Sequence, residues 1–436
     1  MKPATPRSVA FVALFLVLVG FLASTYSYRR ITDTELNSFQ TRALVLHGDV
    51  DLARYPRAHN PAFFSAERGG HLYSIYGVGV TVVAAPLYVV LARTDTSESF
   101  REGAAAIPFV AAAVLLMYVL LSRLVDRRLA VAGAFMFGFG TTMWPLASMA
   151  MFQHGPVAVF QLIGLIGLFS DKPRAPAVAG VGFAGAAFIR PTTGIAFALV
   201  GLLYLARGKR AVGRYAAGSL FPIAGIVIQN RWIWGTWMTG GYSQSGIGFD
   251  GDMPSALWGL TLGWWRGMFV YSPFLLLGVV GLVMALRGIH GDVGQKLAVL
   301  GVAVVGTVVL YSRWSTWHNG LNQFGYRYLL DIVPFLVVLA TYAASRSERV
   351  RTYAIPLAAI SLLTMTFGAA PDNHGLDGVT FATRVQDSSL GEAWIRFFDA
   401  PLKGLWRLAG LAAVAAVFAF LAPRSTARSL FAPRET

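Results

Sequence analysis

The sequence contains no cysteine and few charged residues. The absence of cysteine from all 436 residues excludes disulfide bonds, thiolate metal sites and cysteine nucleophiles. Only 13% of the residues are charged, whereas 56% are hydrophobic. A soluble domain typically carries about 25% charged residues. The composition therefore excludes an ordinary soluble protein and indicates a membrane protein.

Acidic residues are scarce relative to basic ones, which gives a formal net charge of +15. Such an excess can indicate nucleic-acid binding. Here, however, the basic residues lie in short gaps between apolar segments, a distribution that is typical of membrane proteins. We therefore expect membrane lipids rather than nucleic acid as partners, with basic residues that set orientation and attract anionic headgroups.

Apolar segments are abundant and recur from one end of the chain to the other. A helix needs about 20 apolar residues to span a bilayer. We predict an all-α bundle of about twelve transmembrane helices, near residues 8–27, 103–122, 129–147, 156–170, 175–189, 192–206, 215–231, 269–286, 297–312, 328–344, 352–369 and 404–422. The first is interpreted as an uncleaved helix rather than a signal peptide, since no convincing cleavage site follows it.

Orientation depends on the segment Ser74–Leu91, which is long enough to cross but contains Gly77, Gly79 and Pro86. If it crossed, every later loop would change sides and several short basic hairpins would be translocated, against the positive-inside rule. We therefore predict that this segment lies in the outer interface or as a re-entrant element. Both termini are then cytoplasmic, as expected for a multi-pass protein of the inner (plasma) membrane.

This orientation divides the chain into regions. Residues 1–27 form the first span, 28–102 the first extracytoplasmic loop with interfacial helices, and 103–345 the core bundle with its outer loops. Residues 346–436 contain the last spans, an extracytoplasmic loop at 370–403 and a tail predicted to be solvated after Pro423. We find no convincing internal repeat and no soluble domain at either end.

The first outer loop opens on two carboxylates, Asp33 and Glu35, just beyond the first span. Water is scarce at a membrane interface, and a carboxylate held there can act as a general base. Alternatively, Thr32 or Asp33 caps the helix that follows. The residues alone leave both interpretations open.

The same loop contains Asp49 and Asp51, which form an Asp-x-Asp pattern. In soluble nucleotide-sugar enzymes, such a pair holds a metal ion against a diphosphate. No nucleotide is expected on the outer side, so a turn with capping acids is the favoured interpretation. Asp250 and Asp252 are too few acids for a calcium loop. No metal site and no cofactor are predicted.

Arg190 interrupts a long apolar stretch near the outer end of a helical hairpin. A guanidinium at membrane depth usually has a partner, and its planar fork suits a phosphate. The alternative is that its side chain simply reaches the interface. Arg327 begins a later span four residues before Asp331, with which it can pair. Equally, Arg327 can face the same cavity as Arg190 and bind an anionic lipid headgroup.

Polar and aromatic residues elsewhere on the outer side are further candidates. His154 follows Gln153 after the third span, and its imidazole can hydrogen-bond a phosphate or a sugar hydroxyl or have no role. Five tryptophans lie where an aromatic belt is expected, and one or two of them can stack on a sugar ring. They are Trp258, Trp264, Trp265, Trp314 and Trp317.

The order of these elements resembles a known class. After the first span and the acid-led loop come the segments HGDVDL, GHLYSIYGVG, FQHGP, IRPTT, WWRGMFVYSP and WHNGLNQFGYRYLLDIVP. Over roughly residues 8–340 this order is similar to that of bacterial polytopic glycosyltransferases of the GT-C class. That superfamily contains mannosyl- and aminoarabinosyltransferases that use lipid-phosphate sugars.

The resemblance implies a helical membrane domain with interfacial helices in its first outer loop. It also implies transfer of a sugar from a polyprenyl-phosphate donor to a hydroxyl of a lipid, glycan or protein acceptor, usually with inversion. By position, Asp33 is the acceptor-activating base, and Arg190 and Arg327 neutralise the departing lipid phosphate. The remaining candidate substrate-binding residues are Gln153, His154, Arg42 and His318.

The sequence departs from the class pattern at two places. No carboxylate occurs in Met149–Gly155, where many relatives place a second acid, which puts a two-acid or metal-assisted site in doubt. Thr34 separates Asp33 from Glu35, whereas many relatives have adjacent acids, so the resemblance leaves open which of the two is the base.

Two other functions remain as alternatives. One is a transporter or flippase of lipid-linked saccharides, although such proteins more often show internal repeats and broken helices. The other is a polysaccharide polymerase or ligase, which would place its key residues in one large later loop. The glycosyltransferase hypothesis makes a geometric prediction: Asp33, Arg190 and Arg327 line one chamber that opens outward.

Overall fold

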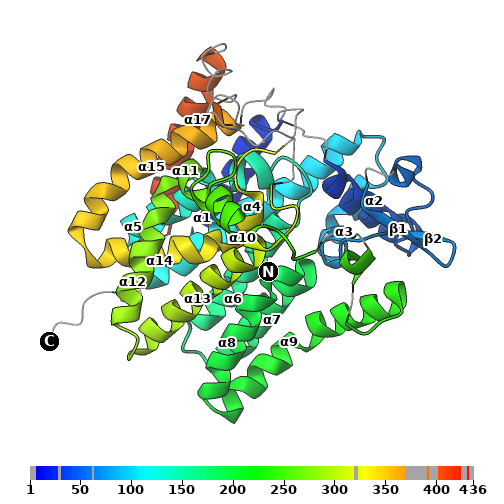
Figure 1. Ribbon diagram of the computed structural model, residues 1–436. Helices are drawn as coiled ribbons and strands as arrows, with labels where there is room; N and C mark the ends of the chain where they lie inside the picture. The colour runs from blue at the N-terminus through cyan, green and yellow to red at the C-terminus, as the bar shows by residue number, and fades with distance from the viewer. Residues whose placement is uncertain are drawn as a thin grey trace.

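The computed structural model shows an all-α protein with one short β-hairpin (Figure 1). It describes residues 6–27, 31–60, 63–238, 240–244, 246, 248–318, 323–369, 390–391, 401–423 and 430–431. The loop predicted at 370–403 therefore lies almost entirely outside the described residues. The described helices mark the chain as a multi-pass membrane protein.

The helices follow one another along the chain with short connections. The N-terminal half contains α1 (Pro6–Ser24), α2 (Thr32–His47), α3 (Gly79–Leu91), α4 (Glu98–Leu124), α5 (Arg127–Phe139), α6 (His154–Leu168), α7 (Ala175–Ile189), α8 (Gly194–Ala206) and α9 (Lys209–Gln229). The C-terminal half contains α10 (Met253–Thr261), α11 (Met268–Tyr271), α12 (Leu276–Arg287), α13 (Asp292–Ser312), α14 (Val333–Arg346), α15 (Glu348–Gly368) and α17 (Pro401–Leu421).

Short irregular helices and one hairpin connect these elements. The 3₁₀ helices are η1 (Pro56–His59), η3 (Pro191–Thr193), η5 (Gly241–Gln244), η6 (Pro273–Leu275) and η7 (Arg327–Ile332), and the π-helical turns are η2 (Met143–Ala147) and η4 (Asn230–Trp234). The antiparallel strands β1 (Ser65–Arg68) and β2 (His71–Ser74) pair Ser65 with Ser74 and Arg68 with His71.

The structure corrects the predicted number of spans. Among the described residues, six helices are long and apolar enough to cross a membrane: Glu98–Leu124, Lys209–Trp234, Asp292–Ser312, Arg327–Arg346, Glu348–Gly368 and Gly404–Leu421. Six further apolar helices in the described part contain only 10–17 residues. Two of these begin in the proline-led 3₁₀ turns η3 and η6, which leave fewer residues for the α-helix that follows. Hydropathy alone therefore overestimates the number of spans at about twelve.

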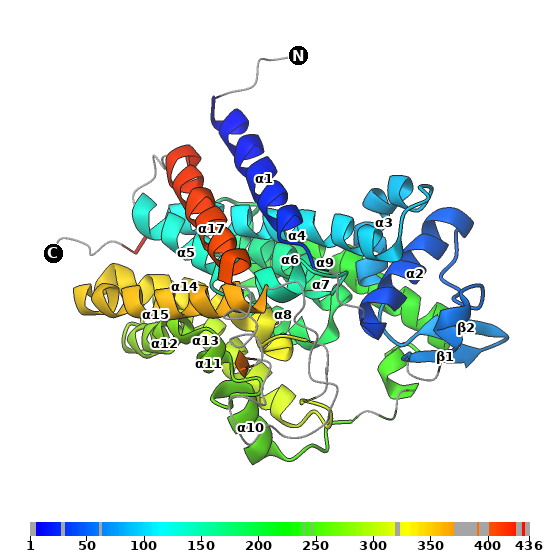
Figure 2. The ribbon, with the colours of Figure 1, turned by 90° about the horizontal axis from the view of Figure 1, so that it is seen from above.

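The segment predicted to be the first outer loop forms a compact unit beside the helical bundle, made of α2, the hairpin and α3 (Figures 1 and 2). Helix α3, in the segment predicted to be interfacial or re-entrant, has 13 residues and is shorter than a span. Its first residue, Gly79, lies so close to α7 that a Cβ would be 2.4 Å from the Phe188 carbonyl oxygen. This contact fixes the first loop against the end of α7, where Arg190 follows.

Small residues also bring the bundle helices close together. A Cβ on Gly182 of α7 would lie 2.1 Å from the backbone nitrogen of Gly164 on α6, and one on Gly218 of α9 would lie 2.0 Å from the Ala177 carbonyl oxygen. Close backbone approach through small residues is typical of helix packing in membranes. It fixes α7 between α6 and α9.

At Phe431 the structure departs from the prediction of a solvated tail. Phe431 is fully buried, and its backbone N–H donates to the Leu124 carbonyl oxygen at 2.9 Å. Its ring packs edge-on against Tyr342, with ring centroids 5.0 Å apart. Burial of an aromatic side chain is favourable because it removes a large apolar surface from water. This explains why Phe431 packs on the bundle.

Candidate functional site

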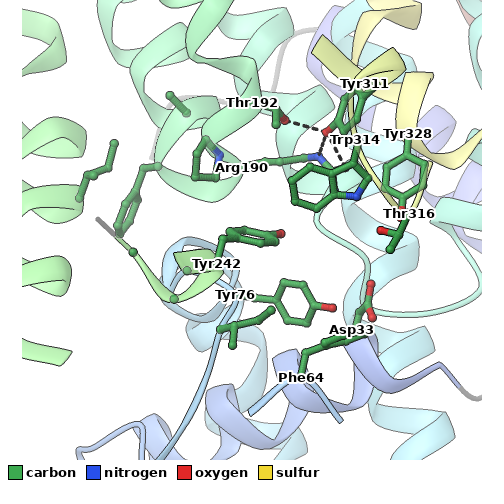
Figure 3. A pocket seen from close by; sticks show the side chains of 18 of the residues that line it. Asp33, Phe64, Tyr76, Arg190, Thr192, Tyr242, Tyr311, Trp314, Thr316 and Tyr328 are labelled. Atoms are coloured by element: carbon green, nitrogen blue, oxygen red, sulfur yellow. Dashed lines mark hydrogen bonds between the residues drawn. The ribbon is translucent and has the colours of Figure 1, made fainter. Parts of the chain in front are cut away.

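A cavity of about 480 Å³ lies between the first outer loop and the bundle (Figure 3). Asp33, Arg190 and Arg327 all line it, although they come from the start of α2, the end of α7 and the start of η7. The geometric prediction of one chamber shared by these three side chains is therefore confirmed. Figure 3 shows Asp33 and Arg190 on opposite sides of the cavity.

Asp33 lies in the first turn of α2 and is only 8% exposed. Its carboxylate forms an ion pair with the Arg327 guanidinium, and the Thr32 hydroxyl donates to its Oδ1 at 3.3 Å. A negative charge in the first turn is also favoured by the helix dipole. The N-cap of this helix is Ile31, whose side chain makes no capping hydrogen bond. Asp33 is therefore a buried cavity residue and not the N-cap.

Arg327 pairs with Asp33 and not with Asp331, so the suggested i,i+4 pair is wrong. The reason is local geometry. Residues Arg327–Ile332 form a 3₁₀ helix, in which residues four apart point in different directions. The guanidinium of Arg327 also lies over the Phe152 ring, 5.1 Å from its centroid. A cation–π contact of this kind helps to hold a charge in a dry site.

Arg190 ends α7 in an extended conformation that turns its side chain toward the cavity. Its Nε lies 2.7 Å from Oδ2 of Asp331, and its Nη2 donates to the Tyr311 hydroxyl at 2.7 Å. Its Nη1 donates to Oε1 of Gln153 at 3.3 Å. The buried guanidinium is thus held on three sides. The interpretation that Arg190 simply reaches the interface is not supported, because it is only 6% exposed.

Gln153 and His154 lie behind Arg190 rather than at the cavity wall. Nδ1 of His154 lies 2.7 Å from Oδ1 of Asp331, and both side chains are buried. His154, Asp331 and Arg190 therefore form a continuous polar row that ends at the cavity. Direct contact of Gln153 or His154 with a ligand in this cavity is not supported, because neither side chain lines it.

Tyrosines form much of the cavity wall. Tyr76 and Tyr242 pack edge-to-face with ring centroids 5.8 Å apart, and Tyr242 packs against Trp314 at 5.9 Å. Burial raises the pKa of Tyr76 and of Tyr242 above its ordinary value, so both phenols stay protonated and can donate hydrogen bonds. No sequence pattern pointed to these tyrosines, whereas Trp314 is one of the five tryptophans assigned to an aromatic belt, of which one or two can stack on a sugar ring.

Glu35 does not share the cavity with Asp33. Residues two apart on an α-helix are about 200° apart around its axis, so Asp33 and Glu35 face different sides of α2. Glu35 is 1% exposed and pairs with Arg57, with Nη1 and Oε1 2.6 Å apart. Of the two acids between which the resemblance left the base open, only Asp33 lines this cavity.

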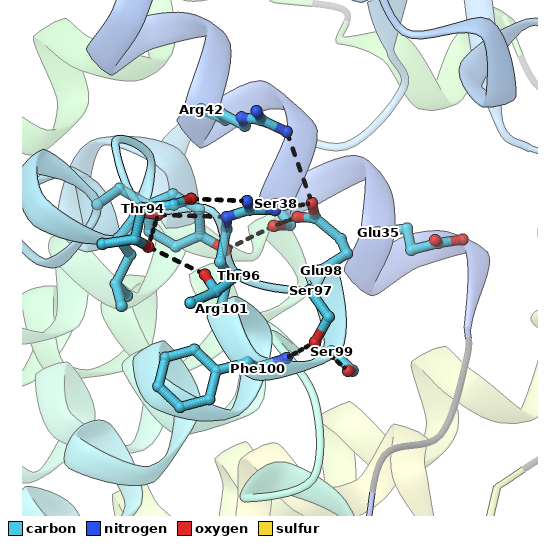
Figure 4. Close-up of polar contacts among 12 residues, drawn as sticks. Glu35, Ser38, Arg42, Thr94, Thr96, Ser97, Glu98, Ser99, Phe100 and Arg101 are labelled. Carbon is cyan, nitrogen blue, oxygen red and sulfur yellow. Dashed lines mark hydrogen bonds and ion pairs between the residues drawn. The ribbon is translucent and has the colours of Figure 1, made fainter.

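Arg42 belongs to a separate polar cluster that joins α2 to the start of α4 (Figure 4). It lies 3.9 Å from Glu98, which also pairs with Arg101 at 2.9 Å and accepts a hydrogen bond from the Ser38 hydroxyl. Figure 4 shows Glu35 on the same helix but apart from this cluster. Arg42 thus contacts Glu98 and does not line the cavity.

The remaining predicted residues lie outside the cavity as well. His318 is exposed, and its carbonyl oxygen accepts from Nε1 of Trp265 at 3.4 Å. Asp49 pairs with Arg54 at 2.8 Å, and Asp51 accepts from the backbone N–H of Leu72 at 3.0 Å. Oδ1 of Asp49 also accepts from the backbone N–H of Asp51 at 3.1 Å, and Oδ1 of Asp51 accepts from that of Ala53 at 2.9 Å, so both acids make local structural contacts. Within the described ranges, no three His, Asp or Glu side chains gather in a way that suits a metal ion.

The arrangement pairs each cavity arginine with a carboxylate, Arg327 with Asp33 and Arg190 with Asp331. Such a site can exchange a carboxylate for another anion while the guanidinium stays in place. Opposite walls offer protonated phenols and apolar side chains, which suits a ligand with hydroxyls, an anionic group and an apolar part.

No protein-family model matches the sequence, and no curated protein is significantly similar to it.

Proposed function

We propose that the protein is an integral membrane glycosyltransferase. It transfers a sugar from a polyprenyl-phosphate donor to an acceptor hydroxyl on the extracytoplasmic face of the plasma membrane, with inversion at the anomeric carbon. Both termini are on the cytoplasmic side. The observation that carries this proposal is the shared cavity of Asp33, Arg190 and Arg327.

The cavity offers a separate place for each part of such a donor. Phe188, Ile226 and Met238 line it, and Met238 is 91% exposed, which supports an apolar opening through which a prenyl chain leaves. The phenols of Tyr76 and Tyr242 face the same space and can bind sugar hydroxyls. The phosphate belongs beside the two guanidinium groups, whose planar forks match its oxygens.

Asp33 is the general base in this mechanism. Its carboxylate takes the proton of the acceptor hydroxyl while the acceptor oxygen forms a bond to the anomeric carbon. The bond from that carbon to the phosphate oxygen breaks, and the phosphate keeps the electron pair. One negative charge therefore disappears from Asp33 as one appears on the phosphate.

Arg327 is placed to stabilise this movement of charge. It pairs with Asp33 before the reaction and, as Asp33 becomes protonated, its guanidinium is free to bind the departing phosphate. Arg190 remains held by Asp331 and Tyr311 throughout. A preorganised cation that does not have to reorient stabilises developing charge most effectively.

The test uses full-length protein reconstituted in lipid nanodiscs. Decaprenyl phosphate carrying labelled mannose or aminoarabinose is supplied with lipid and saccharide acceptors, and the labelled product is measured. Asp33→Asn is expected to abolish transfer. The matched control is Asp49→Asn, because Asp49 lies in the same loop but outside the cavity.

Two results would overturn the proposal. Equal transfer by Asp33→Asn and the parent would remove Asp33 from the role of base. Movement of labelled lipid across a liposome membrane without formation of any new glycosidic bond would instead identify a transporter.

A further inference from the structure

A second cavity of about 300 Å³ lies next to the first one. It is lined by Thr32, Glu35, Arg57, Asn60 and Phe63. Thr32 lines both cavities, and its hydroxyl donates to the carboxylate of Asp33. The second cavity therefore ends at the residue that neighbours the proposed base.

The polar groups of this cavity are fixed in place. Both carboxylate oxygens of Glu35 meet the guanidinium of Arg57, with Oε1 2.6 Å from Nη1 and Oε2 2.7 Å from Nη2. Glu35 is buried, whereas the side chain of Arg57 is 42% exposed. The ion pair thus presents a partly exposed guanidinium beside a buried carboxylate.

The lining differs in chemistry from that of the larger cavity. It combines a carboxylate, a guanidinium, an amide, a hydroxyl and one aromatic ring, whereas apolar side chains and phenols dominate the larger cavity. Alternating donors and acceptors beside an aromatic face suit a sugar, which offers hydroxyls around its edge and C–H groups on its face. An alkyl chain would offer these polar groups no hydrogen bond in place of the water that it displaces, which is costly.

We propose that this second cavity is the acceptor site and that the acceptor is a saccharide; this rests on the proposed function. The attacking hydroxyl reaches Asp33 past Thr32, so donor and acceptor approach the base from different sides of α2. Glu35 and Arg57 bind the acceptor and take no part in proton transfer. This assignment explains why the two acids of the first loop face opposite sides of one helix.

The test is Arg57→Lys, which keeps the charge and loses the fork. Arg54→Lys is its matched control, because Arg54 forms a similar pair with Asp49 three residues earlier and does not line either cavity. In the nanodisc assay, Arg57→Lys is expected to raise KM for methyl α-mannoside about tenfold, the scale set by one hydrogen bond to a charged group. KM for the donor should not change. Glu35→Gln should act in the same direction as Arg57→Lys.

The outcomes separate this inference from the proposed function. Transfer to 1-octanol but not to methyl α-mannoside, or an equal rise of both KM values in Arg57→Lys, would overturn the acceptor site and leave the glycosyltransferase intact. If the parent transfers no sugar, binding of methyl α-mannoside is measured by saturation-transfer NMR. Binding that weakens in Arg57→Lys but not in Arg54→Lys would support a saccharide site, and no binding by the parent would refute it.

Discussion

Asp331 holds Arg190 from behind, with Oδ2 of the carboxylate 2.7 Å from Nε of the guanidinium. Both side chains are buried, yet only Arg190 lines the cavity. The other carboxylate oxygen of Asp331 is bound to His154. In the proposed mechanism Asp331 is therefore a positioning residue, because it can act on a ligand in the cavity only through Arg190.

This relationship predicts that the effects of Asp331→Asn and Arg190→Gln are not additive. Asp331→Asn leaves Arg190 without its counter-charge and frees it to turn, so KM for the polyprenyl-phosphate donor should rise. Once Arg190 is replaced by Gln, the loss of Asp331 should have little further effect on KM. The double-mutant cycle should give a coupling free energy of at least about 1 kcal/mol, as residues in contact do.

Glu98→Gln is the control for that cycle. Glu98 also pairs with an arginine, Arg101 at 2.9 Å, but in the cluster between α2 and α4 and away from the cavity. Its substitution should lower the unfolding temperature and add independently to Arg190→Gln. Additive effects of Asp331→Asn and Arg190→Gln on donor KM would mean that Asp331 has a structural role only.

Arg327→Lys should lower kcat by about 10²-fold, which is the scale of removing one donor that stabilises transition-state charge. Lysine keeps the positive charge but cannot span from the carboxylate of Asp33 to the phosphate with a planar fork. Donor KM should change much less than kcat. Steady-state kinetics of the reconstituted protein give both values.

Arg313→Lys provides the comparison for Arg327→Lys. Arg313 directly follows α13, is exposed and does not line the cavity. It should retain the kcat of the parent. A kcat of Arg327→Lys equal to that of Arg313→Lys would remove Arg327 from the mechanism.

The sequence was sufficient to select Asp33, Arg190 and Arg327 as candidates, because a charged side chain near or within an apolar segment is conspicuous and is energetically costly to bury in a membrane. The sequence was not sufficient to predict which arginine pairs with which carboxylate. The 3₁₀ geometry at Arg327 separates it from Asp331, and no apolar periodicity reveals a 3₁₀ turn. The sequence could have predicted that Glu35 and Asp33 face different sides. This follows as soon as a helix is assigned from Thr32, because residues two apart on a helix are about 200° apart around its axis.

The tyrosines of the cavity were beyond sequence reasoning. Tyr76 lies between β2 and α3, and Tyr242 lies in η5. Tertiary packing alone brings them together. An aromatic residue in an outer loop of a membrane protein has the same sequence signature whether it lies in the interfacial belt or in a binding cavity. The number of spans was overestimated because hydropathy finds apolar segments but does not show how long each helix is, and six apolar helices in the described part have only 10–17 residues.

The first loop should loosen in acid. Burial by itself would raise the pKa of Asp51. The hydrogen bonds from His71 and from the backbone N–H groups of Ala53 and Leu72 outweigh this effect and hold the pKa of Asp51 below its ordinary value. A lowered pKa in the folded state contributes stability above the unfolded pKa of about 4, and this stability is lost as the pH falls through the folded pKa. His71 is the titratable side chain that pairs with Asp51.

Hydrogen exchange in peptides covering residues 48–74, corrected for the intrinsic effect of pH, measures this change. Protection should fall below about pH 4 in the parent. Asp51→Asn cannot ionise, so its protection should be lower at neutral pH and should vary less with acid. The same pH profile for both proteins would show that Asp51 does not stabilise the loop.

Gly79→Ala should separate the first loop from the bundle. The added Cβ would lie 2.4 Å from the Phe188 carbonyl oxygen and 2.5 Å from the Ile189 Cα, and backbone atoms cannot move aside as a flexible side chain can. Overpacking of this kind costs about 1–3 kcal/mol. Because α3 packs against α2, the displacement should also move Asp33 away from Arg190 and lower kcat.

The control is Gly194→Ala in α8, where the added Cβ meets no atom within 4 Å. This change should instead be neutral or slightly stabilising. Thermal unfolding in detergent and sugar transfer are measured for both variants, and a Gly79→Ala protein as stable and active as Gly194→Ala would show that the contact between α3 and α7 does not position the site.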